Sequence, residues 1–201
     1  MRREGTWLNG RGVAGVELYW LPLGAGGRSV RINGRVYEGV VSRIEGRRPL
    51  ALYHSALLVT GPSGRFVIEV TPVTGGEPAA RGAVAEGAVG TRLAQRLRIF
   101  RYEVRCWRNG AIPDVEEAVD SPCELSSDAA TAEHVLCLVP HVPTLVWGRD
   151  ERGTGDMWNS NSVISWLITR SGLPVEAVQP PPGGRAPGWK TGIVVARRER
   201  A

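Results

Sequence analysis

Short stretches of alternating apolar and polar residues recur along the first half of the chain, and this period of two is typical of half-buried β-strands. The first strand is expected at residues 15–24, GVELYWLPLG. Residues 29–43 alternate on both sides of Asn33-Gly34, a dipeptide that suits tight hairpin turns because both central positions need positive φ. A hairpin is therefore expected over residues 29–43.

The clearest hairpin pattern covers residues 51–73, in which two runs rich in aliphatic and β-branched residues flank the turn sequence GPSG. A turn centred on Pro62 and Ser63 places Thr60 opposite Arg65, and the numbers of facing residues then have a constant sum. This register predicts which residues of the two strands share a face of the sheet.

Helical spacing replaces alternation in two later segments. Residues 126–143 begin with serine and aspartate cap candidates and carry apolar residues at helical spacing. Residues 160–172, SNSVISWLITRSG, predict a second helix, with arginine in the last turn and glycine just after it. Further strands are expected at residues 97–107 and 189–198. This order predicts an α+β fold, with an antiparallel sheet packed against a few helices.

The composition fits one folded domain. Of the 201 residues, 42% are hydrophobic, which allows a sizeable core. We expect a single domain at residues 12–198, preceded by a flexible tail at residues 1–11. The net charge is +5, but the arginines are scattered and part of the excess lies at the two chain ends. The charge therefore does not favour nucleic-acid binding.

Cysteine spacing and hydropathy limit the classes of protein to which the chain could belong. Cys106, Cys123 and Cys137 show no Cys-x-x-Cys spacing, which argues against a zinc site and a disulfide framework. Free thiols fit the reducing cytoplasm, where we expect the protein. No apolar run reaches the length of a membrane span, and we recognise no secretory signal. No metal or other cofactor is indicated.

Two groups of polar residues could carry chemistry. In the 51–73 hairpin, the expected register places His54 opposite Thr71 and makes Glu69 its diagonal neighbour on the same face, where a carboxylate could orient an imidazole. Downstream, the start of the 160–172 helix exposes backbone N–H groups that could steady an oxyanion. Ser160 lies there between Asn159 and Asn161, but its hydroxyl needs a hydrogen-bonded base, for which His54 is the candidate.

This order of motifs resembles that of the circularly permuted papain-like hydrolases. These include the LRAT-type acyltransferases and PPPDE-type peptidases, which are relatives of the NlpC-type cell-wall peptidases. Their helix motif is similar to N-C-N-x-F, and this chain has NSNSV at residues 159–163. The sequence YHSALLV at residues 53–59 is similar to the family's histidine strand. The resemblance covers about 110 residues, from His54 to the helix after Ser160.

The resemblance implies a permuted papain-like fold and a reaction on an amide or ester of a peptide, lipid or other acyl substrate. It implies Ser160 as nucleophile, in place of the family's cysteine, His54 as general base and Glu69 as orienting residue. Asn159, Asn161 and Trp158 would form the oxyanion site or shape the cleft. The serine also leaves open a catalytically inactive papain-like binding module.

Each candidate residue also has a structural interpretation. Ser160 could be a helix cap, because serine and asparagine are favoured N-cap residues. His54 could be a half-buried strand histidine bonded to a backbone carbonyl. Glu69 could lie on a solvated face, although its apolar neighbours favour a buried strand in which a carboxylate requires a partner. The tryptophans near Ser160 could belong to the core.

Overall fold

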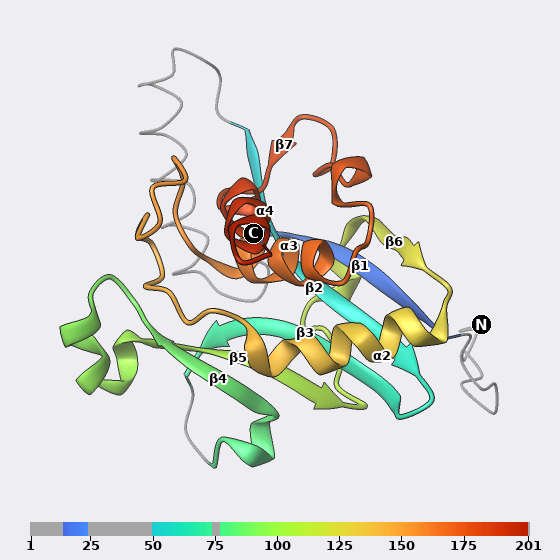
Figure 1. Cartoon of the computed structure of the whole chain (residues 1–201), viewed down its shortest axis with the longest axis horizontal. Helices are drawn as coiled ribbons and strands as arrows, with labels where there is room; N and C mark the ends of the chain where they lie inside the picture. Colours follow the sequence, from blue (N-terminus) through green and yellow to red (C-terminus); the bar gives the residue numbers. More distant parts are fainter. Residues whose placement is uncertain (1–13, 24–49, 74–76, 201) are drawn as a thin grey trace, which may run out of the picture.

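A mixed sheet lies at the centre of the structure, a computed structural model that describes residues 14–23, 50–73 and 77–200 (Figure 1). Six antiparallel strands follow the order β4-β5-β3-β2-β1-β6, and the short β7 pairs in parallel with β2. The strands are β1 (Gly15–Pro22), β2 (Ala51–Gly61), β3 (Gly64–Pro72), β4 (Ala83–Ala88), β5 (Arg101–Arg108), β6 (Val119–Ser126) and β7 (Gly184–Arg185).

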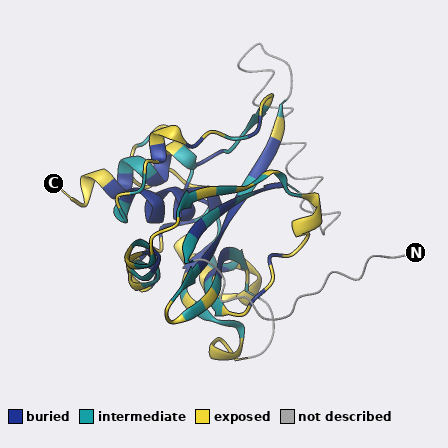
Figure 2. Ribbon diagram, turned by 90° about the vertical axis from the view of Figure 1, so that its right-hand side faces the viewer, coloured by how far each residue is buried: buried dark blue, intermediate teal, exposed yellow. Residues whose placement is uncertain are grey.

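Helices cover one face of this sheet. The α-helices in the described residues are α2 (Ala129–Leu138), α3 (Ser160–Arg170) and α4 (Trp189–Arg198). The larger apolar cluster joins all three to the sheet and includes Leu57, Val104, Val135 and Leu167. In Figure 2 the dark blue, buried positions run along the strands and through α3. The predicted α+β fold is confirmed.

Short 3₁₀ turns join the larger elements. They are η1 (Ala79–Arg81), η2 (Arg92–Arg96), η3 (Arg98–Phe100), η4 (Val115–Glu117), η5 (Val139–His141) and η6 (Val175–Ala177). A second, smaller apolar cluster lies on the opposite face of the sheet and comprises Leu21, Ala56, Leu58, Val67 and Ile112. Alternate residues of β2 therefore face different layers: Leu57 faces the helices and Leu58 faces the smaller cluster.

The 51–73 hairpin has the predicted register near its turn. Thr60 pairs with Arg65, and Gly61 pairs with Gly64. Pairing between β2 and β3 ends at Leu57 and Ile68, after which β3 continues against β5 and β2 continues against β1. The two strands therefore stay neighbours only in the half of the hairpin that lies next to the turn.

The two predicted helices are confirmed, and each begins at a side-chain cap. Asp128 caps α2, where its carboxylate accepts a 2.7 Å hydrogen bond from the backbone N–H of Thr131. Asn159 caps α3, whose last turn contains Arg170. Gly172 follows with a φ of 83°, a left-handed conformation that glycine adopts without a Cβ clash.

Residues 189–198 form the helix α4, so the predicted strand is wrong. The β-branched run Ile193-Val194-Val195 favours a strand locally, but contact with α3 outweighs this preference. A Cβ on Gly192 would stand 2.0 Å from the carbonyl oxygen of Ser162, so the absence of a side chain allows α3 and α4 to cross closely. Trp189, at the start of α4, packs its ring 4.9 Å from that of Trp20 on β1.

Three strands, β4, β6 and the two-residue β7, were not predicted, and the strand predicted at residues 97–107 begins too early. β4 and β6 are edge strands with irregular registers, and both have weak alternation in the sequence. Residues 98–100 form η3, so β5 begins at Arg101 and not at residue 97. The predicted tail at residues 1–11 and hairpin at residues 29–43 lie outside the described residues. Of the described helices, none combines the length and hydropathy that a bilayer crossing requires.

Candidate functional site

The NSNS sequence begins α3 with a reciprocal cap. The side-chain oxygen of Asn159 accepts hydrogen bonds from the backbone N–H groups of Asn161, at 2.9 Å, and Ser162, at 3.3 Å. The Ser162 hydroxyl in turn accepts a 3.1 Å bond from the Asn159 N–H. Three backbone N–H donors at the helix start, those of Asn159, Asn161 and Ser162, are thereby occupied.

Asn161 connects the start of α3 to two other elements. Its side-chain amide donates 2.9 Å bonds to the carbonyls of Tyr53 on β2 and Pro187 before α4. Its side-chain oxygen accepts a 2.9 Å bond from the hydroxyl of Ser55. Asn161 is only 2% exposed, so these three bonds form a buried joint, and two of them connect α3 to residues of β2 more than 100 positions away in the sequence.

Ser162 and Ser165 attach α3 to the start of α4. The Ser162 hydroxyl donates a 2.8 Å bond to the carbonyl of Gly188, and the Ser165 hydroxyl donates a 2.7 Å bond to the carbonyl of Trp189. Asp156 accepts a 2.7 Å bond from the N–H of Gly188. Most polar groups at the α3 start therefore hold the fold together.

Ser160 differs from its neighbours. It is the first residue of α3 and is 6% exposed, but its hydroxyl has no hydrogen-bond partner among the described residues. The cap of α3 is Asn159, so Ser160 does not serve as the N-cap. No base is positioned within the described residues to take a proton from this hydroxyl.

His54 lies on the face of the sheet opposite α3. Neighbouring residues of a strand point to opposite faces, and the adjacent Ser55 contacts Asn161 on the helix side. His54 therefore shares a face with Ala56 and Leu58, which belong to the smaller apolar cluster. The sheet separates the His54 imidazole from the Ser160 hydroxyl, so the predicted serine–histidine contact is not formed.

Burial strongly affects the histidine. It lowers the pKa of His54 from 6.5 to about 4, and the charge of Asp114 opposes this shift only in part. At neutral pH the imidazole is therefore uncharged. A group with this pKa is also a weak base for activating a serine hydroxyl.

The lowered pKa of His54 predicts that the folded protein loses stability in acid. The unfolded chain binds a proton at His54 below about pH 6.5, whereas the folded protein resists protonation until about pH 4. Stability from neutral His54 is thus present above pH 6.5 and is lost as the pH falls toward 4. We expect a loss of about 2 kcal/mol between about pH 7 and pH 5, which urea unfolding can measure.

His54→Gln provides the comparison, because glutamine cannot titrate in this range. Its unfolding free energy should change less over the same pH interval. NMR titration of the imidazole gives an independent check, and a His54 pKa near or above its ordinary value would contradict the prediction.

Glu69 is paired with an arginine and not with His54. Because β2 and β3 stop pairing at Leu57 and Ile68, the expected diagonal contact between His54 and Glu69 is not formed. Glu69 instead lies opposite Arg105 on β5, with 3.6 Å between its Oε1 and the guanidinium. Burial raises the pKa of Glu69, and the charge of Arg105 partly opposes this effect.

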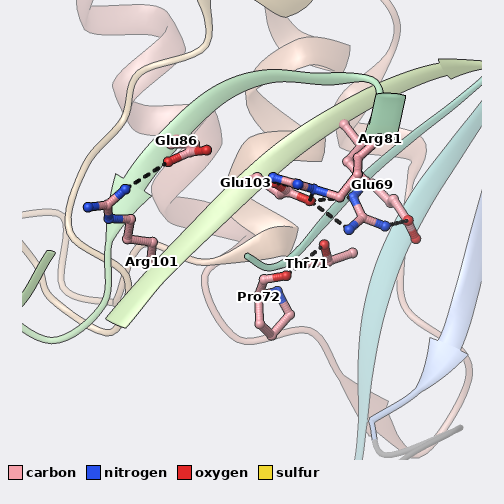
Figure 3. A network of polar contacts seen from close by, with 8 residues as sticks. Glu69, Thr71, Pro72, Arg81, Glu86, Arg101 and Glu103 are labelled. Atoms are coloured by element: carbon pink, nitrogen blue, oxygen red, sulfur yellow. Dashed lines mark hydrogen bonds and ion pairs between the residues drawn. The ribbon is translucent and has the colours of Figure 1, made fainter. Parts of the chain in front are cut away.

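Glu69 and Arg105 belong to a buried polar network that sequence reasoning missed; Glu69, Arg81 and Glu103 of this network are labelled in Figure 3. Its centre is Glu103, which is fully buried and accepts a 2.8 Å bond from Arg81 and a 2.6 Å bond from Arg105. Burial raises the pKa of Glu103, but hydrogen bonds from the two arginines outweigh this effect and hold the pKa below its ordinary value. Glu103 and Arg105 lie two positions apart on β5, so they share a face of the strand. This spacing of opposite charges was the signal in the sequence that could have predicted the network.

Trp158 belongs to the core. It is fully buried, its indole Nε1 has no hydrogen-bond partner among the described residues, and its backbone forms a bridge with Trp147. Asn159 and Asn161 use their side chains in the bonds described above. Because His54 lies across the sheet from Ser160 and Glu69 pairs with Arg105, the predicted Ser160–His54–Glu69 arrangement is not assembled.

Comparison of the chain with protein-family models, with curated proteins and with solved structures finds no match. Within residues 14–23, 50–73 and 77–200, no group of three histidine, cysteine or acidic side chains is placed to hold a metal ion.

Proposed function

We propose that the protein is a non-catalytic binding protein, and not a hydrolase acting through Ser160. The observation that carries this proposal is the position of His54 across the sheet from the start of α3. A serine hydroxyl has a high pKa, and a helix N-terminus alone does not activate it. Under this proposal, the resemblance to permuted papain-like hydrolases would concern the scaffold and not the chemistry.

The bonding at the start of α3 supports the same proposal. Asn159, Asn161 and Ser162 use their polar groups to connect α3 with β2 and with the start of α4. In a hydrolase this region would need donors directed at a substrate oxygen. Here the backbone N–H groups of Asn161 and Ser162 donate to the side-chain oxygen of Asn159.

A serine-reactive fluorophosphonate probe tests the proposal. We expect no labelling of the wild-type protein, because no base is placed to activate the Ser160 hydroxyl. Labelling that disappears in Ser160→Ala would overturn the proposal. A Ser160→Cys variant adds a second measurement, in which site-specific mass spectrometry follows alkylation by iodoacetamide.

Cys137 is the internal reference for that experiment, because it is an exposed thiol on α2. We expect the introduced thiol to react no faster than Cys137 and to be insensitive to His54→Gln. Fast alkylation that depends on His54 would show an assembled catalytic pair and contradict the proposal.

A hydrolase or acyltransferase acting on a peptide, lipid or other acyl substrate is the second candidate. One observation favours it: the Ser160 hydroxyl, at the positive end of the α3 dipole, is the polar group of this motif left without a partner in the described residues. The fluorophosphonate experiment distinguishes the two functions directly.

A further inference from the structure

A separate surface suggests what the protein binds. Between β4 and β5 the chain leaves the sheet and forms η2 and η3, which extend to the left of Figure 1 as light green turns. We call residues 91–101, TRLAQRLRIFR, the β4–β5 protrusion. Its sequence combines four large apolar residues with four arginines and contains no acidic residue.

The apolar side chains of the β4–β5 protrusion face solvent. Leu93 is 77% exposed, Leu97 60%, Ile99 79% and Phe100 39%. These are four of the six large apolar residues that are exposed in the described part of the chain. Isolated exposed apolar residues are ordinary, but four within eight positions on one projection indicate an interaction surface.

The base of the protrusion is fixed to the body of the domain. Arg92 forms an ion pair with Glu151, with 3.1 Å between its Nε and the carboxylate, and Arg101 lies 3.6 Å from Glu86. The hydroxyl of Thr91 accepts a hydrogen bond from the N–H of Leu93 and caps η2. The exposed apolar residues are thus presented on an anchored segment.

The combination of arginine and aliphatic side chains on one projection indicates the chemistry of the surface that it binds. Arg96 and Arg98 are exposed beside Leu97 and Ile99. Guanidinium groups bind phosphate oxygens, and aliphatic and aromatic side chains enter the region just below lipid headgroups. A basic segment also gains from the negative surface potential of a membrane that contains anionic lipids.

We propose that the β4–β5 protrusion docks on an anionic phospholipid surface, with its apolar side chains inserted and the exposed Arg96 and Arg98 near the phosphates. Charge complementarity favours this partner over an apolar protein groove, because the segment contains four arginines and no acidic residue. Of these arginines, Arg92 and Arg101 at its base are paired with the glutamates named above. The inference names a partner for the binding role proposed above and rests on that role.

Vesicle co-sedimentation of the full chain tests the inference. Phosphatidylcholine vesicles are compared with vesicles that also contain phosphatidylserine. We expect binding to the anionic vesicles to be about tenfold stronger, and to weaken as salt is added. Ile99→Ser and Arg96→Glu should each weaken this binding by about tenfold.

Matched controls come from elsewhere on the surface. Val115→Ser removes an exposed apolar side chain on η4, and Arg108→Glu reverses an exposed charge at the other end of β5. Both should bind like the wild type. All four substituted side chains are exposed, so circular dichroism melts should show that the variants remain folded.

Absence of wild-type binding to either vesicle would overturn the inference, as would equal weakening by the control variants. Self-association that Ile99→Ser abolishes, seen by sedimentation velocity without vesicles, would assign the surface to a second copy of the chain and also overturn it. Fluorophosphonate labelling of Ser160 would overturn the non-catalytic proposal but would leave the vesicle result unchanged, so the two failures can be told apart.

Discussion

Replacing Asn161 by leucine is expected to destabilise the protein by about 4 kcal/mol, whereas Ser160→Ala, one residue earlier, should change stability by less than about 1 kcal/mol. Leucine has the same number and branching of side-chain heavy atoms as asparagine but no polar atom. It therefore removes the bonds from Asn161 to Tyr53 and Pro187 and the bond that Ser55 donates. The hydroxyl of buried Ser55 then lacks the acceptor it has in the wild type.

Ser160→Ala is the matched control because it changes the same turn of the same helix. The Ser160 hydroxyl has no hydrogen-bond partner among the described residues, and alanine has a higher helix propensity than serine. Urea unfolding with a two-state fit measures both variants, provided that their m-values agree. Equal destabilisation by the two substitutions, or a larger cost for Ser160→Ala, would contradict the structural role assigned to Asn161.

The comparison also distinguishes two interpretations of the NSNS sequence. If it existed chiefly to cap a helix, Asn159 would carry most of the stability and Asn161 would contribute little. In the structure Asn161 instead joins β2, α3 and the segment before α4. The sequence could not show this role, because its partner Ser55 lies 106 positions away.

Local features of the fold were predictable because they depend on neighbouring residues. The GPSG turn determines the pairing of Thr60 with Arg65, and Asp128 caps α2 with its own side chain. The position of His54 relative to Ser160 depends on two facts outside the hairpin. One is the point where β3 stops pairing with β2 while it still pairs with β5, and the other is the face of β2 that α3 covers.

The strand register could place His54 and Glu69 on the same side of the hairpin, but it could not say whether that side meets a helix. Periodicity also failed at residues 189–198, where Ile193, Val194 and Val195 favour a strand when considered alone. Their helical conformation depends on Gly192, which lets α4 approach Ser162 and Ser165. Long-range packing thus decided both the site geometry and the last element.

The buried network on β3 and β5 provides the other large effect. Glu103→Gln is expected to destabilise the protein by about 4 kcal/mol near pH 7, because the guanidinium groups of Arg81 and Arg105 would lose the buried carboxylate between them. Glu69→Gln is the matched control on the neighbouring strand. It should leave stability unchanged or raise it by up to about 1 kcal/mol, since Arg105 keeps its bond to Glu103.

The two glutamates should also differ in the sign of their pH dependence. The pKa of Glu103 is lowered in the folded protein, so its stabilisation is present above the ordinary value of 4.5 and is lost as the pH falls through the lower folded value. The pKa of Glu69 is raised, so its contribution becomes less favourable as the pH rises from 4.5 through the higher folded value.

Urea unfolding of both glutamine variants over a pH series measures these contributions. The cost of Glu103→Gln should shrink under acid conditions, and any gain from Glu69→Gln should appear only toward neutral pH. If Glu69→Gln were as costly as Glu103→Gln at neutral pH, Glu69 would be an equal partner of Arg105. The network would then be centred on Arg105 and not on the buried carboxylate of Glu103.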